Sequence, residues 1–118
     1  MAIQRLHTNR RMSQIVIHRD TIYLAGQTAE NTDTGIEQQT ADTLQAIEKL
    51  LAEAGSDKEH ILSVTIYLKD IERDFAGMNA VWDRWLPEGV APARATVEAG
   101  MCESDILVEM SVTAVKRE

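Results

Sequence analysis

Regular alternation of apolar and polar side chains near the C-terminus is the feature that most constrains the fold of this chain. It runs through residues 93–99 and 106–115, where nearly every second residue is apolar or alanine. Because side chains two positions apart in a strand share a face, both stretches are predicted to be strands with one apolar and one polar face. The polar rows carry Arg94 and Glu109.

Arg94 and Glu109 are not expected in these strands on packing grounds, so they form the candidate site. If the two strands pair as antiparallel neighbours, the pleat places the guanidinium and the carboxylate on the same side of the sheet. The alternative is that the two residues form a structural salt bridge at a subunit interface.

The rest of the chain supplies four more β-rich stretches and two amphipathic ones. The strands are predicted at residues 3–6, 14–18, 21–25 and 61–68, and the helices at residues 36–54 and 74–86. Arg19-Asp20 has the spacing of a two-residue hairpin turn. This order predicts an α+β fold in which a six-stranded mixed sheet carries two helices packed on one face.

The expected ends and buried faces of the helices follow from local patterns. Thr34 is a candidate N-cap of the first helix with Glu37 completing a capping box, and Gly55 is a natural stop. In the strand at 61–68, Leu62, Val64, Ile66 and Leu68 are expected to share the apolar face. The second helix is expected to bury Phe75, Met78, Val81, Trp82 and Trp85.

With both helices on one face, the other face of the sheet is left open. It is expected to carry a mixture of hydroxyl-bearing and apolar side chains together with Arg94 and Glu109. A half-apolar face of this size is commonly buried against another subunit. We therefore expect a homo-oligomer with its site near the interfaces.

Composition narrows the classes of function. A chain of 118 residues is one domain, spanning 1–118, and a net charge of -7 argues against nucleic acid as a partner. No apolar segment suggests a signal peptide or a membrane span, so a cytoplasmic protein is expected. No Cys/His cluster predicts a metal site, and the single cysteine, Cys102, beside Glu103, is expected to be unreactive.

Five segments carry a resemblance that spans nearly the whole chain. They are Met12-Ser13-Gln14, Tyr23-Leu24-Ala25-Gly26-Gln27, Asp74-Phe75-Ala76-Gly77-Met78-Asn79, and Pro92-Ala93-Arg94-Ala95-Thr96-Val97-Glu98 followed by Leu107-Val108-Glu109-Met110. Together they resemble the RidA (YjgF/YER057c/UK114) family. The arginine and the glutamate, fifteen residues apart, are the most specific element. The match is closer to the branch typified by the bacterial YoaB protein than to RidA itself.

The resemblance implies a chorismate-mutase-like subunit that assembles into a homotrimer, with the sheets forming a central barrel and three clefts between subunits. It also implies an enamine/imine deaminase, a hydrolase that converts 2-aminoacrylate or 2-iminobutanoate to a 2-oxo acid and ammonia. No cofactor and no metal are implied. The partners would be a small 2-imino or 2-oxo acid and two further copies of the chain.

The family's functional residues carry over to particular positions of this chain. Arg94 matches the arginine that grips the substrate carboxylate, and Glu109 matches the glutamate that positions or activates water. Asn79 matches a cleft asparagine, and Gly26 matches the glycine that follows the second strand of the hairpin. Thr96, on the same polar strand face as Arg94, is counted with the substrate-binding residues, as are Ala25 and Met12.

Three departures from the family pattern keep other hypotheses open. Ala25 stands where RidA has a serine, Met12 stands where it has a tyrosine, and Cys102-Glu103 replaces a common Leu-Pro. A non-catalytic trimer that binds small carboxylates through Arg94 is therefore the alternative. An endoribonuclease, a label given to some relatives, is disfavoured by the acidic balance and by the lack of a histidine pair.

Overall fold

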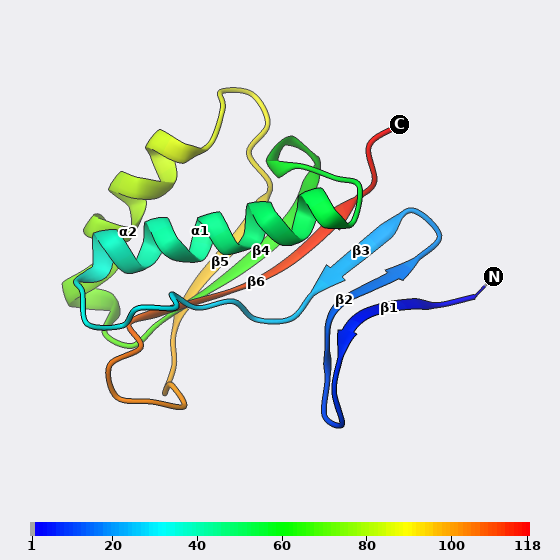
Figure 1. Ribbon diagram of the computed structural model, residues 1–118. Coiled ribbons are helices and arrows are strands. Elements are labelled where there is room, and N and C mark those ends of the chain that lie inside the picture. The colour runs from blue at the N-terminus through cyan, green and yellow to red at the C-terminus, as the bar shows by residue number, and fades with distance from the viewer. Residues whose placement is uncertain (1) are drawn as a thin grey trace.

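The computed structural model describes residues 2–118, which form a six-stranded mixed sheet with two helices on one face (Figure 1). The sheet order is β1-β2-β3-β6-β4-β5, and the β4–β5 pair is parallel whereas the other neighbours are antiparallel. The elements are β1 (Gln4–Thr8), β2 (Ser13–His18), β3 (Thr21–Leu24), α1 (Ile36–Glu53), the 3-10 turn η1 (Lys58–His60), β4 (Ile61–Leu68), α2 (Ile71–Trp85), β5 (Ala93–Glu98) and β6 (Val108–Val115). This architecture confirms the predicted fold class.

The predicted two-residue turn between β2 and β3 is confirmed. His18 pairs with Thr21, so Arg19 and Asp20 form the loop, and Arg19 adopts a left-handed φ of 59°. Two-residue hairpin loops require such backbone because its twist matches that of the flanking strands.

Helix α1 begins and ends close to the predicted residues, but the predicted capping box is wrong. Gly35 occupies the N-cap without a side-chain cap, while the Thr34 hydroxyl donates to the Asn31 carbonyl. At the other end Gly55 has a φ of 84°, and its N–H and that of Ser56 bond to the last carbonyls of the helix. A left-handed glycine there is the usual way to end a helix.

Helix α2 starts three residues before the predicted position. The Asp70 carboxylate accepts a hydrogen bond from the Arg73 N–H and so caps the helix, and Glu98 Oε1 accepts from the Ile71 N–H. Two carboxylates at a helix N-terminus also complement its dipole. Residues 71–73, which lie outside the predicted helix at 74–86, therefore form the first turn of the helix.

The core lies between the sheet and the two helices. It is formed by the inward rows of β2, β3, β4 and β6 together with residues of both helices, among them Ile15, Ile22, Leu44, Leu51, Ile66, Met78, Val108 and Met110. Two expected core residues are exposed. Leu62 is 48% exposed because the β4–β6 register shifts between Ile61 and Ser63, and Phe75 is 42% exposed on α2. Trp85 is half-buried.

In strand β5 the polar row of side chains faces the helices, whereas in β4 and β6 the apolar row does. Arg94 pairs with Val64, which in turn pairs with Val112, and both valines are buried under the helices. The polar row of β5 therefore faces the helices, and its row of Ala93, Ala95 and Val97 lies on the open face. The exposed apolar row supports the expectation that the open face is covered by another subunit.

Neither helix within residues 2–118 has the length and apolar character needed to cross a bilayer.

Candidate functional site

Arg94 lies near the start of β5, the strand at one edge of the sheet, and its side chain is contacted by two residues of helix α2. Its Nη1 donates to the Asn79 side-chain oxygen at 2.8 Å, and its guanidinium carbon lies 5.2 Å from the ring centroid of Trp82. The Arg94 residue is nevertheless exposed. A guanidinium carries five N–H donors, so most of them remain available to an incoming anion.

Thr96 adds a backbone donor at the same edge. The Ala99 N–H bonds to the Leu68 carbonyl, so the backbone groups of alternate residues in β5 point toward β4, and those of Arg94 and Thr96 point to the free edge. The Thr96 hydroxyl is the buried side-chain polar atom left without a partner among the residues described. The structure thus places an outward-facing N–H beside Arg94.

Glu109 lies on the opposite, open face of the sheet. It pairs with Tyr67 of β4 and lines a shallow pocket of about 310 Å³. The other residues lining the pocket are Gly26, Tyr67, Ala99, Gly100, Met101 and Ser111. This pocket lies between the sheet and the start of the β5–β6 loop, and it joins a carboxylate, a phenol and a serine hydroxyl in one cavity.

Gly26 makes the position of Glu109 possible. A Cβ on residue 26 would lie 3.1 Å from the Glu109 Cδ, tighter than most real Cβ contacts, and closer still to Oε2, at a separation that real Cβ atoms essentially never show. The bridge between Gln27 and Met110, with both N–H···O bonds formed, fixes the two backbones against each other. A residue with a side chain at position 26 would displace the carboxylate.

The expectation that Arg94 and Glu109 share one side of the sheet is wrong. Strand β4 lies between β5 and β6, so the two strands are not neighbours. Arg94 pairs with Val64, whose side chain faces the helices, so Arg94 also lies on the helix-facing side of the sheet. Glu109 pairs with Tyr67 and lies on the other side. One subunit therefore carries a basic group on one face and an acidic group on the other, and no ion pair joins them within residues 2–118.

The remaining predicted site residues are placed as follows. Asn79 contacts Arg94 from α2. Ala25 precedes Gly26 and donates its N–H to the Gln14 carbonyl. Met12 is 43% exposed in the β1–β2 turn, where its N–H bonds to the Asn9 side chain. Neither Ala25 nor Met12 lines the Glu109 pocket of the described subunit.

Sequence reasoning missed two residues of the site. Trp82 was assigned to the core alone, although its ring also carries the Arg94 guanidinium. Tyr67 was not singled out in its strand, and its register opposite Glu109 depends on a β4–β6 pairing that the sequence pattern does not specify. The signal available for Tyr67 was an isolated aromatic residue on a hydroxyl-bearing strand face.

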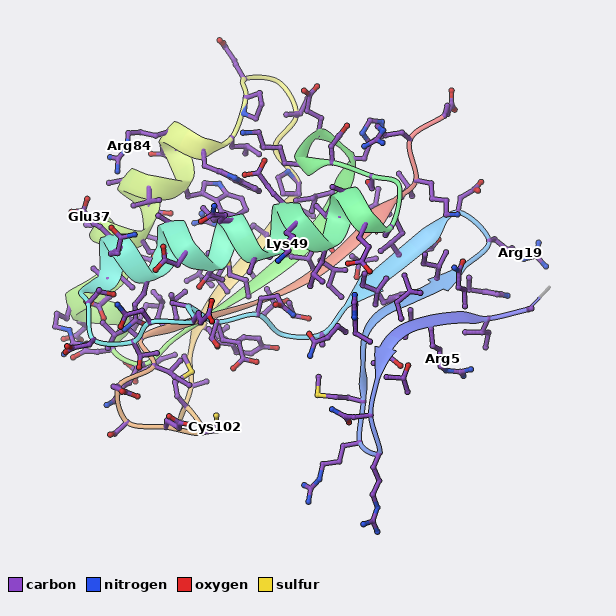
Figure 2. The ribbon with its side chains drawn as sticks, in the orientation of Figure 1. Arg5, Arg19, Glu37, Lys49, Arg84 and Cys102 are labelled. Atoms are coloured by element: carbon purple, nitrogen blue, oxygen red, sulfur yellow. The ribbon has the colours of Figure 1, made fainter. Side chains whose placement is uncertain are left out.

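Other candidate centres are weaker. Cys102 is exposed in the loop between β5 and β6, away from both helices (Figure 2). Among residues 2–118 there is no group of three or more His, Cys, Asp or Glu side chains placed to hold a metal ion.

Comparisons with known proteins agree on one family. The family model described as Endoribonuclease L-PSP matches residues 2–116. RutC family protein YoaB of Escherichia coli (strain K12) is 43% identical over 114 residues, which cover 97% of this chain and 98% of that protein. A RutC family protein of Haemophilus influenzae is 40% identical over 115 residues, with coverages of 97% and 98%.

Solved structures extend the similarity to the whole fold. A crystal structure of a member of the YjgF protein family from Neisseria meningitidis has a TM-score of 0.95 at 46% identity and covers 100% of this chain and 98% of that one. A member of the YjgF/YER057c/UK114 family from Mycobacterium tuberculosis has a TM-score of 0.80 at 28% identity, with coverages of 88% and 86%. The chain therefore belongs to the RidA/YjgF family, on the branch that includes YoaB.

Proposed function

We propose that this protein is an imine/enamine deaminase that hydrolyses small 2-imino acids, or the 2-aminoacrylate type of enamine from which they form, to 2-oxo acids and ammonia. It would act as a homotrimer in which each site lies between two subunits. The observation that carries the proposal is the pair of half-sites in one chain, with an exposed, oriented Arg94 and a glutamate fixed against Gly26 in a pocket.

The Arg94 half-site suits the carboxylate of a 2-imino acid. A planar guanidinium binds a carboxylate through two parallel hydrogen bonds, a geometry that lysine cannot reproduce. The Thr96 N–H at the free edge of β5 supplies a further donor for the same anion. Each charge-assisted hydrogen bond of this kind contributes about 1.5–3 kcal/mol.

The Glu109 half-site suits the hydrolytic step. In the proposed reaction the carboxylate takes a proton from water while the water oxygen bonds to the carbon of the protonated imine (C=NH2+), whose π electrons move onto nitrogen to give a neutral carbinolamine. The protonated acid then returns that proton to the nitrogen, the C–N bond breaks with its electron pair leaving on nitrogen, and the carbonyl forms as the hydroxyl proton is released. One carboxyl group acts first as base and then as acid.

Assembly is what would bring the two half-sites together. Arg94 and Glu109 lie on opposite faces of one sheet, so a ligand that touches both must lie between two copies of the chain. The open face carries the exposed side chains Tyr23 and Val97 as well as the hydroxyl groups of β6. Covering such a face is a common reason for subunits to associate.

The proposal is tested by supplying 2-aminoacrylate from serine with a PLP-dependent dehydratase and following the formation of the 2-oxo acid. We expect the wild-type protein to accelerate hydrolysis over buffer, and Arg94→Ala to abolish the acceleration. Arg84→Ala is the matched control, because Arg84 is an exposed arginine whose carboxylate partner, Glu37, lies 3.8 Å away on α1 (Figure 2). Full activity in Arg94→Ala would reject the assignment.

Calorimetry with 2-oxobutanoate separates this function from carboxylate binding alone. Binding that depends on Arg94, without any turnover of the imine, would favour the non-catalytic trimer. Neither binding nor turnover would reject both hypotheses.

A further inference from the structure

We infer that Trp82 is a positioning residue for Arg94, setting the plane in which the guanidinium meets an anion. The inference deepens the proposed function and rests on it, because the anion is the carboxylate of the proposed substrate. Trp82 is 6% exposed, so its ring is almost inaccessible to a ligand. It would act through Arg94 and would not touch the substrate.

Two contacts from one helix restrain the guanidinium in different ways. The guanidinium carbon lies 5.2 Å from the centroid of the Trp82 ring, and the Asn79 side-chain oxygen accepts from Nη1 at 2.8 Å. Asn79 and Trp82 are three residues apart and so share a face of α2. The ring restrains the tilt of the guanidinium plane, and the hydrogen bond restrains its rotation within that plane.

The Trp82 ring is itself fixed. Trp85 packs against it with ring centroids 5.6 Å apart and an interplanar angle of 47°. The Trp85 indole N–H bonds to Glu48 of α1 at 2.9 Å, and the ammonium of Lys58 lies 5.3 Å from the Trp85 centroid while donating to the Trp85 carbonyl. Each helix therefore contributes to holding the surface on which Arg94 rests.

The consequence is preorganisation of the anion-binding group. A long arginine side chain on an exposed strand edge normally loses rotamer freedom when it binds a ligand. Here the guanidinium is already oriented, while the donors not used by Asn79 remain free for an anion. Removing the aromatic face is expected to weaken carboxylate binding while leaving the charge in place.

The experiment compares Trp82→Leu and Trp82→Phe with wild type, using 2-oxobutanoate as the probe in calorimetry and the 2-iminobutanoate assay for kinetics. We expect Trp82→Leu to bind about 2- to 30-fold more weakly, which is the range of a cation–π contact, and to raise KM with kcat nearly unchanged. Trp82→Phe retains an aromatic face and should recover most of the affinity. Equal affinity in wild type and Trp82→Leu would overturn the inference.

A second measurement covers the case in which Trp82→Leu does not fold. The chain has two tryptophans, so in a Trp85→Phe background Trp82 is the sole one and can be replaced by fluorinated tryptophans. Fluorine withdraws electron density from the ring face with little change of shape, so affinity for 2-oxobutanoate should fall stepwise with each added fluorine. No trend across the series would also overturn the inference.

NMR of the Arg94 Nε–H group distinguishes this inference from the proposed function. The signal should be shifted by the ring current of Trp82 in wild type and should move to an ordinary position in Trp82→Leu. If wild type neither binds 2-oxobutanoate nor hydrolyses the imine, the proposed function fails whatever the NMR shows. If wild type does bind it and the Arg94 signal is the same in both proteins, the positioning role alone fails.

Discussion

The Glu109 carboxylate occupies the space that a side chain on residue 26 would need. A Cβ built on Gly26 lies 3.1 Å from the Glu109 Cδ, and the hydrogen bonds between Gln27 and Met110 leave the two strands little freedom to separate. The conformation of the acid on β6 therefore depends on the absence of a side chain at the end of β3.

Replacing Gly26 with alanine should move the carboxylate and reduce the proposed deaminase activity. A displacement of about 1 Å at a reacting group costs up to about 100-fold in rate, so we expect a loss of about 10- to 100-fold in kcat/KM. Gly35→Ala is the control, because a Cβ there meets nothing within 4 Å. The steady-state assay with 2-iminobutanoate checks this, and an unchanged rate in Gly26→Ala would show that the position of Glu109 is not limiting.

Mixing two inactive variants should restore part of the activity. Arg94 and Glu109 lie on opposite faces of one subunit, so the proposed site between copies of the chain would take the arginine from one chain and the glutamate from the next. In trimers assembled at random from Arg94→Ala and Glu109→Gln chains, about a quarter of the sites would carry both wild-type groups. Activity near that fraction after joint refolding is expected, and no recovery would place both groups of each site in one chain.

Gln39 is expected to contribute to the stability of the fold through its hydrogen bonds, although its side chain is polar and buried. It is fully buried, its amide group donates to the Thr32, Thr34 and Asp105 carbonyls, and its oxygen accepts from the Leu107 N–H. Gln39→Leu leaves these backbone groups unpaired, and we expect a loss of about 1–3 kcal/mol in the free energy of unfolding.

Gln38→Leu provides the comparison for that measurement by urea denaturation. Gln38 is exposed and bonds only to the Asp42 side chain in the described structure, so its replacement should change the free energy by less than about 0.5 kcal/mol. Equal losses in the two variants would contradict the role given to Gln39.

Asp57 should make the fold more sensitive to acid. The hydrogen bond from His60 lowers the pKa of the Asp57 carboxyl below its usual range, helped by the Glu59 N–H and by Arg117 at 3.8 Å. Because the folded pKa lies below the unfolded value, the stabilisation is present above about pH 4 and is lost as the pH falls through the folded pKa.

Asp57→Asn isolates that contribution, because asparagine can still cap the 3-10 turn. We expect the variant to be less stable at pH 7, by no more than about 1 kcal/mol since the pair is exposed, and to converge with wild type below about pH 3. Chemical denaturation across this pH range checks the curve. A constant difference at every pH would mean that the charge of Asp57 does not contribute.

The sequence predicted the fold well because its signals were periodic. The apolar rows of β2, β4 and β6 and the amphipathic face of α1 predicted their elements to within a few residues. The start of α2 was missed because its capping group is Asp70, a residue that is equally at home in a turn. Phe75 was assigned to the core because helical periodicity tolerates one extra position at the edge of an apolar stripe.

The geometry of the site was less accessible to sequence reasoning. Alternation assigns each residue to one of two faces of its own strand, but it does not relate the faces of separate strands. Arg94 and Glu109 were placed together because β5 and β6 were taken as neighbours, and the insertion of β4 between them depends on long-range pairing. Trp82 was missed because the sequence pattern predicts a buried aromatic ring but does not predict which cationic side chain packs against it.

The inverted orientation of β5 has a consequence for the newly made chain. Strand β5 is an edge strand that exposes alanine and valine to water, and Val97 is 41% exposed. Such an edge can pair with an extended segment of another chain. An unassembled subunit is therefore expected to be more prone to aggregation than an assembled one. Association with further copies, as in the proposed trimer, would cover this exposed row and remove this template for pairing.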